Sequence, residues 1–479
     1  MKYVMENREP AAVLRYFEQI SAIPRGSYNE AGIADFLVAF AQARGLEWHR
    51  DQTNNVLIKA PASAGMETHA PLLLQGHTDM VCEKNRDVEH DFLRDPLSLY
   101  VEGSFLRARG TTLGADDGIA VAMMLALLDG EIPRHPAYEC LFTTAEEVGL
   151  DGAHAFDYSR IAARRLINMD SEELGVVTAG CAGGLRSDLT LEYRPEPFAG
   201  ECLHVRIKGL MGGHSGENIN SGRANANKLM GRLLAALEQD MELHLARMEG
   251  GSKDNAIPRE CEAWLAVPDA GAAAELLTGE AARIAQELGA DDRRFELICE
   301  DCEPQACMMS AGDTRRAVAL LACAANGVIE MSRDVAGLVE FSRSLGVVRS
   351  EEGKLTLVFS SRSSIEARLD ASVRELDLLA GLCGCVTRHH SRYPGWSYAA
   401  CSELREAYLA AYHRVTGDDA RVNVIHAGLE CGVIGSHLPG LDMISVGPTM
   451  HNIHSPDEAL DLDSVAVFWR VLGDLIPRL

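Results

Sequence analysis

Positive charge is scarce in this sequence. Its 479 residues include 45 Lys and Arg against 70 Asp and Glu, which gives a formal net charge of −25 at pH 7. Nucleic acids and anionic membrane surfaces are bound through basic patches, so this balance argues against both as partners. Carboxylates are in turn so common that no single Asp or Glu indicates a function by itself.

Long apolar segments are lacking as well. The first ten residues contain no apolar core of a secretory signal, and the longest apolar helical run, residues 119–128, is far shorter than a membrane span. The thirteen cysteines are an odd, scattered set, and the pairs Cys299/Cys302 and Cys383/Cys385 lack the second half of a structural zinc site. We therefore expect reduced, mostly buried thiols in a cytoplasmic protein.

Familiar catalytic signatures are also missing. The sequence contains no His-Glu-x-x-His run, EF-hand loop, Gly-x-Ser-x-Gly elbow or phosphate loop. Its hydrophobic content of 47% and charged content of 24% are those of an ordinary globular protein. The length suggests two or three domains of roughly 150 residues each.

What the sequence does contain is a series of polar clusters at predicted strand ends. The apolar run 72–76 is followed directly by His77 and Asp79. Alternate residues of an extended segment point to the same side, so these two side chains are expected to face one cleft. A carboxylate commonly holds the second ring nitrogen of a metal-bound His. Taken alone, the pattern is equally typical of a solvated strand end.

Further acidic residues follow other predicted strands or open the next helix. They are Asp116 and Asp117 before the apolar helix 119–128, Glu146 and Glu147 after the strand 138–143, and Asp170 after the strand 166–169. Strands that alternate with helices predict an α/β fold, with a mostly parallel sheet sandwiched by helices. Ligands of such sheets bind beyond the carboxyl ends of the strands, so we expect these side chains to converge.

The character of the chain changes at the Gly-rich stretch 180–184, a candidate hinge. We predict a catalytic domain made of residues 1–184 and 396–479, with an inserted α+β lid or dimerisation domain at 185–395 that could comprise two lobes. Within the insert, helices are expected at 225–239, at 317–325 and from 332 onward. A closing helix at 462–475 is expected to be capped by Asp463 or Ser464.

These residue types are what a two-metal hydrolytic site requires. Zinc accepts His nitrogen and carboxylate oxygen. Two ions about 3.5–4 Å apart share a carboxylate and clamp a water, and a further carboxylate carries the proton to the leaving group. Adjacent Glu146 and Glu147 suit a division in which one binds metal and the other acts as base. The plain alternative is an acidic helix start that favours the helix dipole.

Five motifs resemble those of a known family. They are Gln-Gly-His-Thr-Asp-Met (75–80), Gly-Ala-Asp-Asp-Gly-Ile-Ala (114–120), Thr-Ala-Glu-Glu-Val-Gly (144–149), Asn-Met-Asp-Ser-Glu (168–172) and Asn-Ile-His-Ser-Pro (452–456). They look like those of the M20 metallopeptidases, and most like the bacterial aminoacyl-histidine dipeptidases, also called cytosolic non-specific dipeptidases. The resemblance extends over essentially the whole chain. It implies a zinc-peptidase-like catalytic domain split around an inserted lid.

The resemblance also implies a role for each clustered residue. His77 and Asp170 would bind one zinc ion, Glu147 and His454 the second, and Asp116 would bridge the two ions. Glu146 would be the general base, and Asp79 would orient His77. Co²⁺ or Mn²⁺ would be working substitutes for Zn²⁺.

Within the expected lid, the resemblance points to residues that contact substrate. His214, in a Gly-Gly-His-Ser-Gly run, would polarise the scissile carbonyl, although such a run is generally more typical of a turn. Asn255 and Arg362 would bind substrate, since a planar Arg fork suits a free carboxylate. A lone Arg in a strand is more often a surface ion-pair partner. His426, a further substrate-binding candidate, and Glu430 also match the subfamily, with structural support as their default role.

The implied activity is hydrolysis of unblocked dipeptides, including Xaa-His dipeptides such as carnosine, by a metal-bridged water that a Glu general base activates. The alternative with the same metal ligands is an aminoacylase or N-acyl amino acid deacylase. A dipeptidase needs a free amine, which a deacylase rejects. The expected partners are small dipeptides and a second copy through the lid, and one chain is expected to assemble a complete site.

Overall fold

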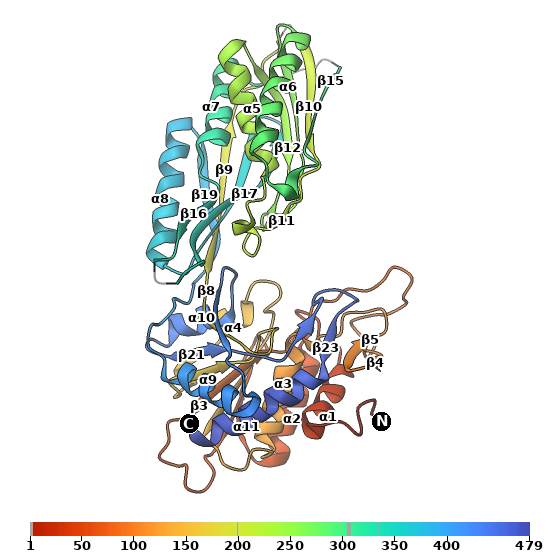
Figure 1. The fold of residues 1–479 in the computed structure, drawn as a ribbon, viewed down its shortest axis with the longest axis vertical. Coiled ribbons are helices and arrows are strands. Elements are labelled where there is room, and N and C mark those ends of the chain that lie inside the picture. The colour runs from red at the N-terminus through yellow and green to blue at the C-terminus, as the bar shows by residue number, and fades with distance from the viewer. Residues whose placement is uncertain (1–2, 199, 304–307, 334) are drawn as a thin grey trace. The chain divides into compact units, whose positions relative to one another are not determined.

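The computed structural model describes residues 3–198, 200–303, 308–333 and 335–479. The chain forms two compact units, and many of their elements are labelled in Figure 1. Unit 1 comprises Met1–Cys181, Ser397–Val424 and Leu429–Leu479, and unit 2 comprises Ala182–Trp396 and Ile425–Gly428. The sequence predicted divisions at 184/185 and 395/396. It gave no sign that residues 425–428 return to unit 2.

Unit 1 is built on an eight-stranded sheet in the order β1-β2-β6-β3-β7-β21-β8-β20. The strands are β1 (Glu47–Arg50), β2 (Val56–Ala60), β3 (Leu72–His77), β6 (Tyr138–Thr143), β7 (Arg165–Asn168), β8 (Val176–Cys181), β20 (Arg421–Ile425) and β21 (Asp442–Ser445). β3 pairs in parallel with β6 and β7, and β7 pairs in parallel with β21. The pairs β1–β2, β2–β6 and β8–β21 are antiparallel. The predicted parallel arrangement therefore holds for the four central strands β6, β3, β7 and β21. Polar clusters follow three of them, β3, β6 and β7.

The apolar run of the sequence lies in α3 (Ala115–Leu128), every residue of which is buried. The helix packs against β3, β6 and α1 (Ala11–Ser21), and a helix buried on all sides needs no polar face. The remaining helices of four or more residues in the described part of unit 1 are α2 (Ala31–Arg44), α4 (Asp151–Ala155), α9 (Glu403–Thr416), α10 (Glu430–His437) and α11 (Leu462–Leu475). The burial of α3 fixes the start of this helix, and with it Asp116, against the end of β3.

A small four-stranded sheet connects the end of the chain to its first third. Its order is β22-β23-β5-β4, with β4 (Leu99–Glu102), β5 (Phe105–Ala108), β22 (Met450–His451) and β23 (Ala459–Asp461). The hairpin β4–β5 pairs through β5 with β23. This pairing holds the loop between β22 and β23, which carries His454, on unit 1.

Unit 2 contains a nine-stranded antiparallel sheet in the order β15-β10-β14-β12-β17-β18-β9-β19, with β16 paired to β17. Its strands are β9 (Gly183–Glu192), β10 (Glu201–Lys208), β12 (His244–Gly250), β14 (Cys261–Val267), β15 (Glu296–Asp301), β16 (Gly327–Met331), β17 (Val339–Glu351), β18 (Lys354–Ser363) and β19 (Val386–Tyr393).

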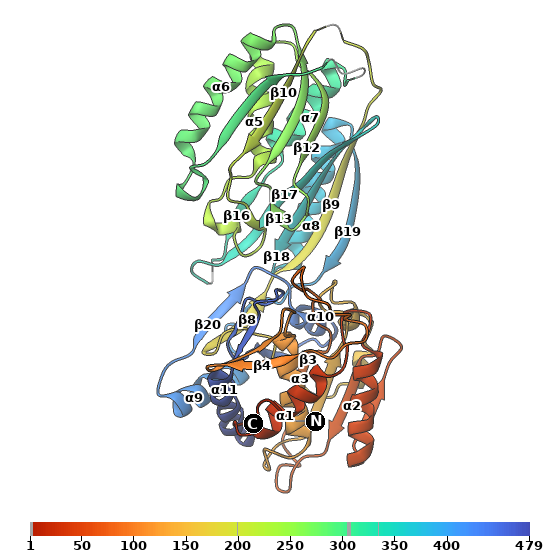
Figure 2. The ribbon, with the colours of Figure 1, turned by 90° about the vertical axis from the view of Figure 1, so that its right-hand side faces the viewer.

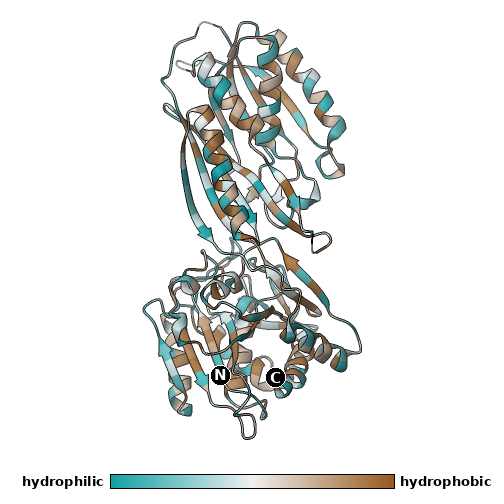
Figure 3. Cartoon of the chain, turned by 90° about the vertical axis from the view of Figure 1, so that its left-hand side faces the viewer, coloured by the Kyte–Doolittle hydropathy of each residue, from teal (hydrophilic) through white to brown (hydrophobic). Residues whose placement is uncertain are grey.

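Four helices share one hydrophobic core with this sheet, namely α5 (Ala226–Asp240), α6 (Ala270–Glu287), α7 (Ala311–Cys323) and α8 (Glu366–Cys383). Figure 2 shows them beside the strands, and in Figure 3 they carry both apolar and polar residues, as amphipathic helices do. The two lobes expected from the sequence are thus joined by one sheet and one core.

Two local predictions are wrong. The helix expected from residue 332 onward is replaced by β17, which pairs with β18 from Phe341 to Glu351. The missed signal is the dipeptide Glu352-Gly353, whose Gly has φ +72° and joins the two strands in a tight hairpin. The cap of α11 is Asp461, because its carboxylate accepts the amides of Asp463 and Ser464, the two residues expected to be caps.

No helix in the described ranges is long and apolar enough to cross a membrane. All cysteines within these ranges are free thiols; six are buried, three are partly exposed and three are exposed. Burial is therefore less complete than the sequence suggested.

Candidate metal centre

The polar clusters of unit 1 converge at the carboxyl ends of its central strands. His77 ends β3, Glu146 and Glu147 lie shortly after β6, and Asp170 lies two residues after β7. Asp116 lies in the first turn of α3, and His454 follows β22. Parallel strands bring their carboxyl ends to one edge, which is why residues so far apart in sequence meet here.

Asp116 lies between the two histidines. Its Oδ1 is 3.0 Å from His77 Nε2, and its Oδ2 is 3.0 Å from His454 Nε2. His77 Nε2 is also 3.7 Å from Asp170 Oδ1, and His454 Nε2 is 3.1 Å from Glu147 Oε2. One carboxylate thus joins two half-sites, each completed by a His and a second carboxylate.

The donor atoms fit divalent cations. In each of three groups, the ligand atoms lie within 4.8 Å of one another: His77, Asp116 and Asp170; Asp116, Glu147 and His454; and His77, Glu146 and Glu147. Glu147 Oε1 is buried and has no hydrogen-bond partner among the described residues. Imidazole and carboxylate are donors that zinc and its first-row neighbours accept, so the set suits two such ions sharing Asp116.

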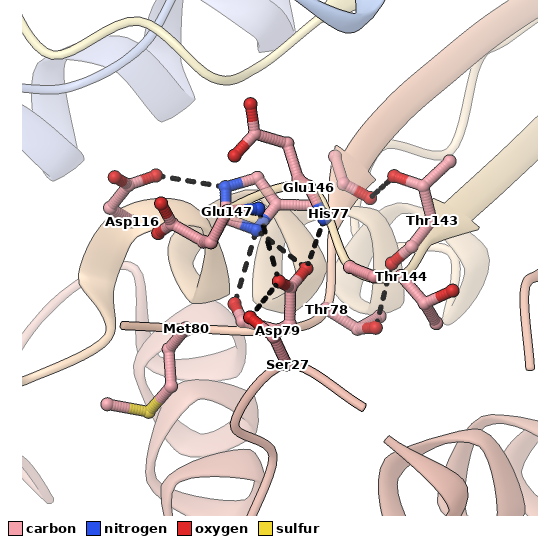
Figure 4. A network of polar contacts seen from close by, with 12 residues as sticks. Ser27, His77, Thr78, Asp79, Met80, Asp116, Thr143, Thr144, Glu146 and Glu147 are labelled. Carbon is pink, nitrogen blue, oxygen red and sulfur yellow. Dashed lines mark hydrogen bonds and ion pairs between the residues drawn. The ribbon is translucent and has the colours of Figure 1, made fainter. Parts of the chain in front are cut away.

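Asp79 supports this arrangement from behind. One of its oxygens is 3.4 Å from His77 Nδ1, and Figure 4 shows the contacts around it. Its carboxylate accepts the amides of Glu146 at 3.1 Å and Glu147 at 3.3 Å, and the hydroxyl of Ser27 at 2.8 Å. Asp79 therefore fixes both the His77 ring and the turn that presents the two glutamates.

The charges of the cluster stabilise one another. Burial alone would lower the pKa of His77, but hydrogen bonds to Asp116 and Asp79 raise it well above its usual value. Hydrogen bonds to Asp116 and Glu147 raise the pKa of His454 to about 10. Burial would raise the pKa of Asp116, yet hydrogen bonds from His454 and His77 hold it below its usual range. The cluster thus contains more carboxylates than imidazoles, and the negative charge of the carboxylates attracts cations.

Two carboxylates outside the His77–Asp116–His454 line, those of Glu146 and Asp170, have raised pKa values. Burial raises the pKa of Glu146 to about 8, with a contribution from the neighbouring charge of Glu147. Burial, together with the charge of Asp117, also raises the pKa of Asp170 well above its usual value. In Figure 4 the carboxylates of Glu146 and Glu147 point in different directions, so adjacent residues occupy different parts of the centre.

The remaining predicted residues lie in unit 2 and form a cluster of their own. His214 and Arg362 approach Gly216, since a Cβ at that glycine would lie 3.1 Å from the His214 ring and 3.3 Å from Arg362 Nε. His426 pairs through Nε2 with Ser342 Oγ at 2.6 Å, and the carbonyl of Asn255 accepts the amide of Ser215 at 2.8 Å. The structure therefore brings His214, Arg362 and His426 together and places the Asn255 backbone beside the His214 turn.

Positive charge dominates this second cluster. Burial and Arg362 lower the pKa of His214, and the same two causes lower the pKa of His426 to about 3. Arg362 is 4% exposed; it donates to Tyr393 Oη at 2.9 Å, and its Nε has no hydrogen-bond partner among the described residues. The cluster thus holds two neutral imidazoles and a guanidinium with an unused donor.

Glu430 is a buried acceptor beneath the metal centre. Its Oε2 accepts hydrogen bonds from Gln75 Nε2 and from Thr143 Oγ1, while Asn168 Nδ2 donates to Gln75 Oε1 at 2.7 Å. These contacts join β3, β6 and β7 directly behind the residues that converge. They agree with the structural role taken as the default for Glu430.

Sequence reasoning missed Ser27 and Glu30. Glu30 is 3% exposed, and its Oε1 accepts the amide of Ala145 at 3.0 Å, next to Glu146. The only sequence signal is the spacing Ser27-x-x-Glu30, which is typical of a capping box and would have indicated a helix start.

Comparison with known proteins places the chain among peptidases. Residues 205–317 match the peptidase dimerisation domain of the M20 family. The cytosol non-specific dipeptidase of Escherichia coli K12 is 38% identical over 474 residues, which are 98% of each chain. The crystal structure of aminoacylhistidine dipeptidase from Vibrio alginolyticus, also 38% identical, superposes with a TM-score of 0.93 over 99% of this chain and 98% of that one. An aminopeptidase of Bacillus cereus, 16% identical, shares the fold with a TM-score of 0.55 over 97% of both chains.

These likenesses define the class of protein, a hydrolase that acts on peptide bonds. The chain belongs to the M20 family of metallopeptidases, as its motifs predicted. The predicted fold class, a mixed α/β domain with an inserted second domain, is confirmed with it.

Proposed function

We propose that this protein is a di-zinc dipeptidase that hydrolyses unblocked dipeptides, including Xaa-His dipeptides such as carnosine. The observation that carries the proposal is the bridging position of Asp116, with an imidazole 3.0 Å from each of its oxygens. The names of the two relatives that are 38% identical support the substrate class.

We assign His77 and Asp170 to one ion, Glu147 and His454 to the other, and Asp116 to both. When bound, two divalent ions would polarise the scissile carbonyl and lower the pKa of a water held between them. Zinc is the preferred metal for this donor set, and Co²⁺ or Mn²⁺ would be substitutes. Asp79 keeps the His77 ring in the orientation that leaves Nε2 free to bind.

Glu146 is the proposed general base. Its carboxylate is buried, and burial raises its pKa to about 8, a range in which a carboxyl group can both accept and return a proton near neutral pH. It would take the proton from the attacking water and deliver it to the leaving amine. Glu147, whose Oε2 is 3.1 Å from His454 Nε2, is held in a position suited to a ligand.

The cluster of unit 2 is the proposed recognition site for the peptide. A free dipeptide ends in a carboxylate, and the unused Nε donor of Arg362 suits that group. Asn255 and His426 would hold the peptide beside it. The neutral imidazole of His214 would donate a hydrogen bond to the carbonyl oxygen as it gains negative charge.

Unit 2 would accordingly act as the lid, and unit 1 as the catalytic domain. The match of residues 205–317 to a dimerisation domain supports a homodimer formed through the lid. The name of the Escherichia coli relative supports a cytoplasmic location.

A substrate panel tests this function. Metal-loaded protein is assayed on carnosine, on other unblocked dipeptides and on N-acetyl amino acids, with product amino acids measured directly. We expect cleavage of the unblocked dipeptides. The cationic cluster of unit 2 suits a free carboxylate, and the proposed dipeptidase activity requires a free amine. Hydrolysis of N-acetyl amino acids with no cleavage of dipeptides would replace the proposal with the aminoacylase alternative.

A further inference from the structure

Two buried residues of opposite charge lie beside the metal centre without belonging to the ligand set. Arg25 is in the loop between α1 and α2, and Glu458 is between β22 and β23, each 2% exposed. Burial lowers the pKa of Arg25, and the negative charge of Glu458 is the largest effect opposing it. Charges that are kept out of water usually serve a specific contact, and here both side chains contact the loops that carry the clustered residues.

Glu458 holds the turn that leads into Asp116. Its Oε2 accepts the amides of Leu113 at 2.7 Å and Gly114 at 3.0 Å. Its Oε1 accepts the amides of Ala115 at 2.8 Å and Asp116 at 3.4 Å. One carboxylate thus fixes four successive amides, and the last of them belongs to Asp116 itself. Because Glu458 shares a loop with His454, these bonds tie the His454 segment to the Asp116 segment.

Arg25 ties the same turn to the end of β3. Its Nη1 donates to the carbonyls of Thr78 at 2.9 Å and Asp79 at 3.1 Å, and its Nη2 donates to the carbonyl of Gly114. Space for the guanidinium exists because its neighbours are glycines. A Cβ at Gly114 would lie 2.6 Å from Nη2, and one at Gly118 would lie 2.5 Å from it.

We propose that Arg25 and Glu458 are positioning residues that set the spacing between His77, Asp116 and His454 and so determine how tightly the centre holds its metal ions. This inference rests on the ligand set of the proposed function. The two side chains hold opposite sides of one turn: Glu458 binds its amides, and Arg25 binds its carbonyl at Gly114. A shift of that turn would move Asp116 away from both histidines at once.

The chain offers a matched control for ordinary buried carboxylates. Glu139 is 4% exposed, and it accepts the amides of Ala162 and Ala163 and pairs with Lys59. It lies near the start of β6, whereas the metal cluster follows the other end of that strand. Glu139→Gln therefore removes a comparable buried acceptor without touching the turn of Asp116.

The experiment measures metal affinity. Full-length, metal-loaded wild type, Glu458→Gln, Arg25→Lys, Glu139→Gln and Asp116→Ala are titrated with a chromogenic chelator, and melting temperatures are recorded in parallel. Gln at position 458 offers one acceptor oxygen for four amides. Lys at position 25 has a single ammonium group, which cannot bind the carbonyls of Thr78 and Asp79 and that of Gly114 as the two ends of a guanidinium do. Both changes should weaken zinc binding about 10–100-fold, the range found when outer-sphere partners of metal ligands are removed. Glu139→Gln should lower the melting temperature and leave zinc affinity within about twofold of wild type.

The outcomes separate this inference from the proposed function. Wild-type zinc affinity in folded Glu458→Gln or Arg25→Lys protein, alongside metal loss in Asp116→Ala, would overturn the positioning role and leave the ligand set intact. Wild-type affinity in Asp116→Ala would overturn the ligand set itself. Equal weakening in Glu139→Gln would show that the effect is general destabilisation and would also overturn the inference. If Glu458→Gln does not fold, Arg25→Lys decides by the same criteria, since it keeps the positive charge.

Discussion

The two clusters of this molecule use histidine in opposite ways. In unit 1, hydrogen bonds to carboxylates raise the pKa of His77 and His454. In unit 2, burial and the charge of Arg362 lower the pKa of His214 and His426. The same side chain is thus placed among acceptors in one cluster and beside a cation in the other. Unit 1 is suited to bind cations, and unit 2 is suited to bind an anionic group and to donate hydrogen bonds.

This contrast assigns different consequences to substitutions in the two clusters. Loss of a group in unit 1 should change metal content or the proton-transfer step. Loss of a group in unit 2 should leave the metals in place and change how substrate is held or how its carbonyl is polarised. Metal analysis beside steady-state kinetics therefore distinguishes the two clusters directly.

The largest difference is expected between the adjacent glutamates of unit 1. Glu146→Ala should lower kcat at least about 100-fold while both ions are retained, because general base catalysis supplies a factor of that order. Glu147→Ala should lose metal, because its Oε2 lies 3.1 Å from His454 Nε2 in the proposed second half-site. Metal analysis and kcat of each variant provide the check. The opposite pattern would mean that the two roles are exchanged.

In unit 2, the variant His214→Ala should lower kcat by about 100-fold, the usual cost of removing one hydrogen-bond donor to a developing oxyanion. KM should change much less, and the metal content should stay that of wild type. A shift in KM with kcat unchanged would place His214 in binding and not in the chemical step.

Mixing inactive Glu146→Ala with inactive His214→Ala protein tests which chain supplies His214. Because we expect one chain to complete its own site, the mixture should stay inactive. Recovery of substantial activity would mean that copies share sites.

A smaller effect is expected for Arg362→Ala. A charge-assisted hydrogen bond contributes about 1.5–3 kcal/mol, so KM for dipeptides with a free C-terminal carboxylate should rise about 10–100-fold. For the same dipeptides with an amidated C-terminus, wild type and variant should have similar KM values. An equal rise for both kinds of substrate would remove the proposed contact with the carboxylate.

The last comparison concerns the pH dependence of stability, where no effect on catalysis is expected. Burial raises the pKa of Glu430 from 4.5 to about 7, so the folded state keeps a proton that the unfolded chain loses. The contribution of Glu430 to the free energy of unfolding is complete below pH 4.5 and is lost as the pH rises through 7. The free energy of unfolding should therefore fall by on the order of 3 kcal/mol across this window because of Glu430. Urea unfolding of metal-free wild type and Glu430→Gln should diverge accordingly, and parallel pH profiles would contradict the shift.

The sequence predicted those parts of the fold that depend on local patterns. The strand at 138–143 and the helix at 462–475 have the predicted bounds, because their apolar periodicity and turn residues are local. The polar strand ends also converge as expected, since ligand atoms of His77, Asp116 and Asp170 lie within 4.8 Å of one another. They converge because the central strands are parallel, so that their carboxyl ends lie at the same edge of the sheet.

Contacts between segments far apart in the chain could not be predicted from the sequence. Gln75 and Glu430 are 355 residues apart, and Leu113 and Glu458 are 345 apart, yet each pair is joined by a buried hydrogen bond. In a chain with 70 acidic residues, nothing in the pattern separates a buried acceptor from a solvated one. Strand β17 was missed for a related reason, since its pairing with β18 decides its conformation.

The central claim is that the cluster around Asp116 holds two divalent ions on which peptide hydrolysis depends. The most direct measurement is the metal content per chain of active protein, together with activity before chelation, after exhaustive chelation and after metal is restored. We predict two divalent ions per chain, zinc by preference, activity that disappears with the ions and returns with them, and loss of both ions in Asp116→Ala. Full activity after exhaustive chelation, or active protein with no bound ion, would contradict the account.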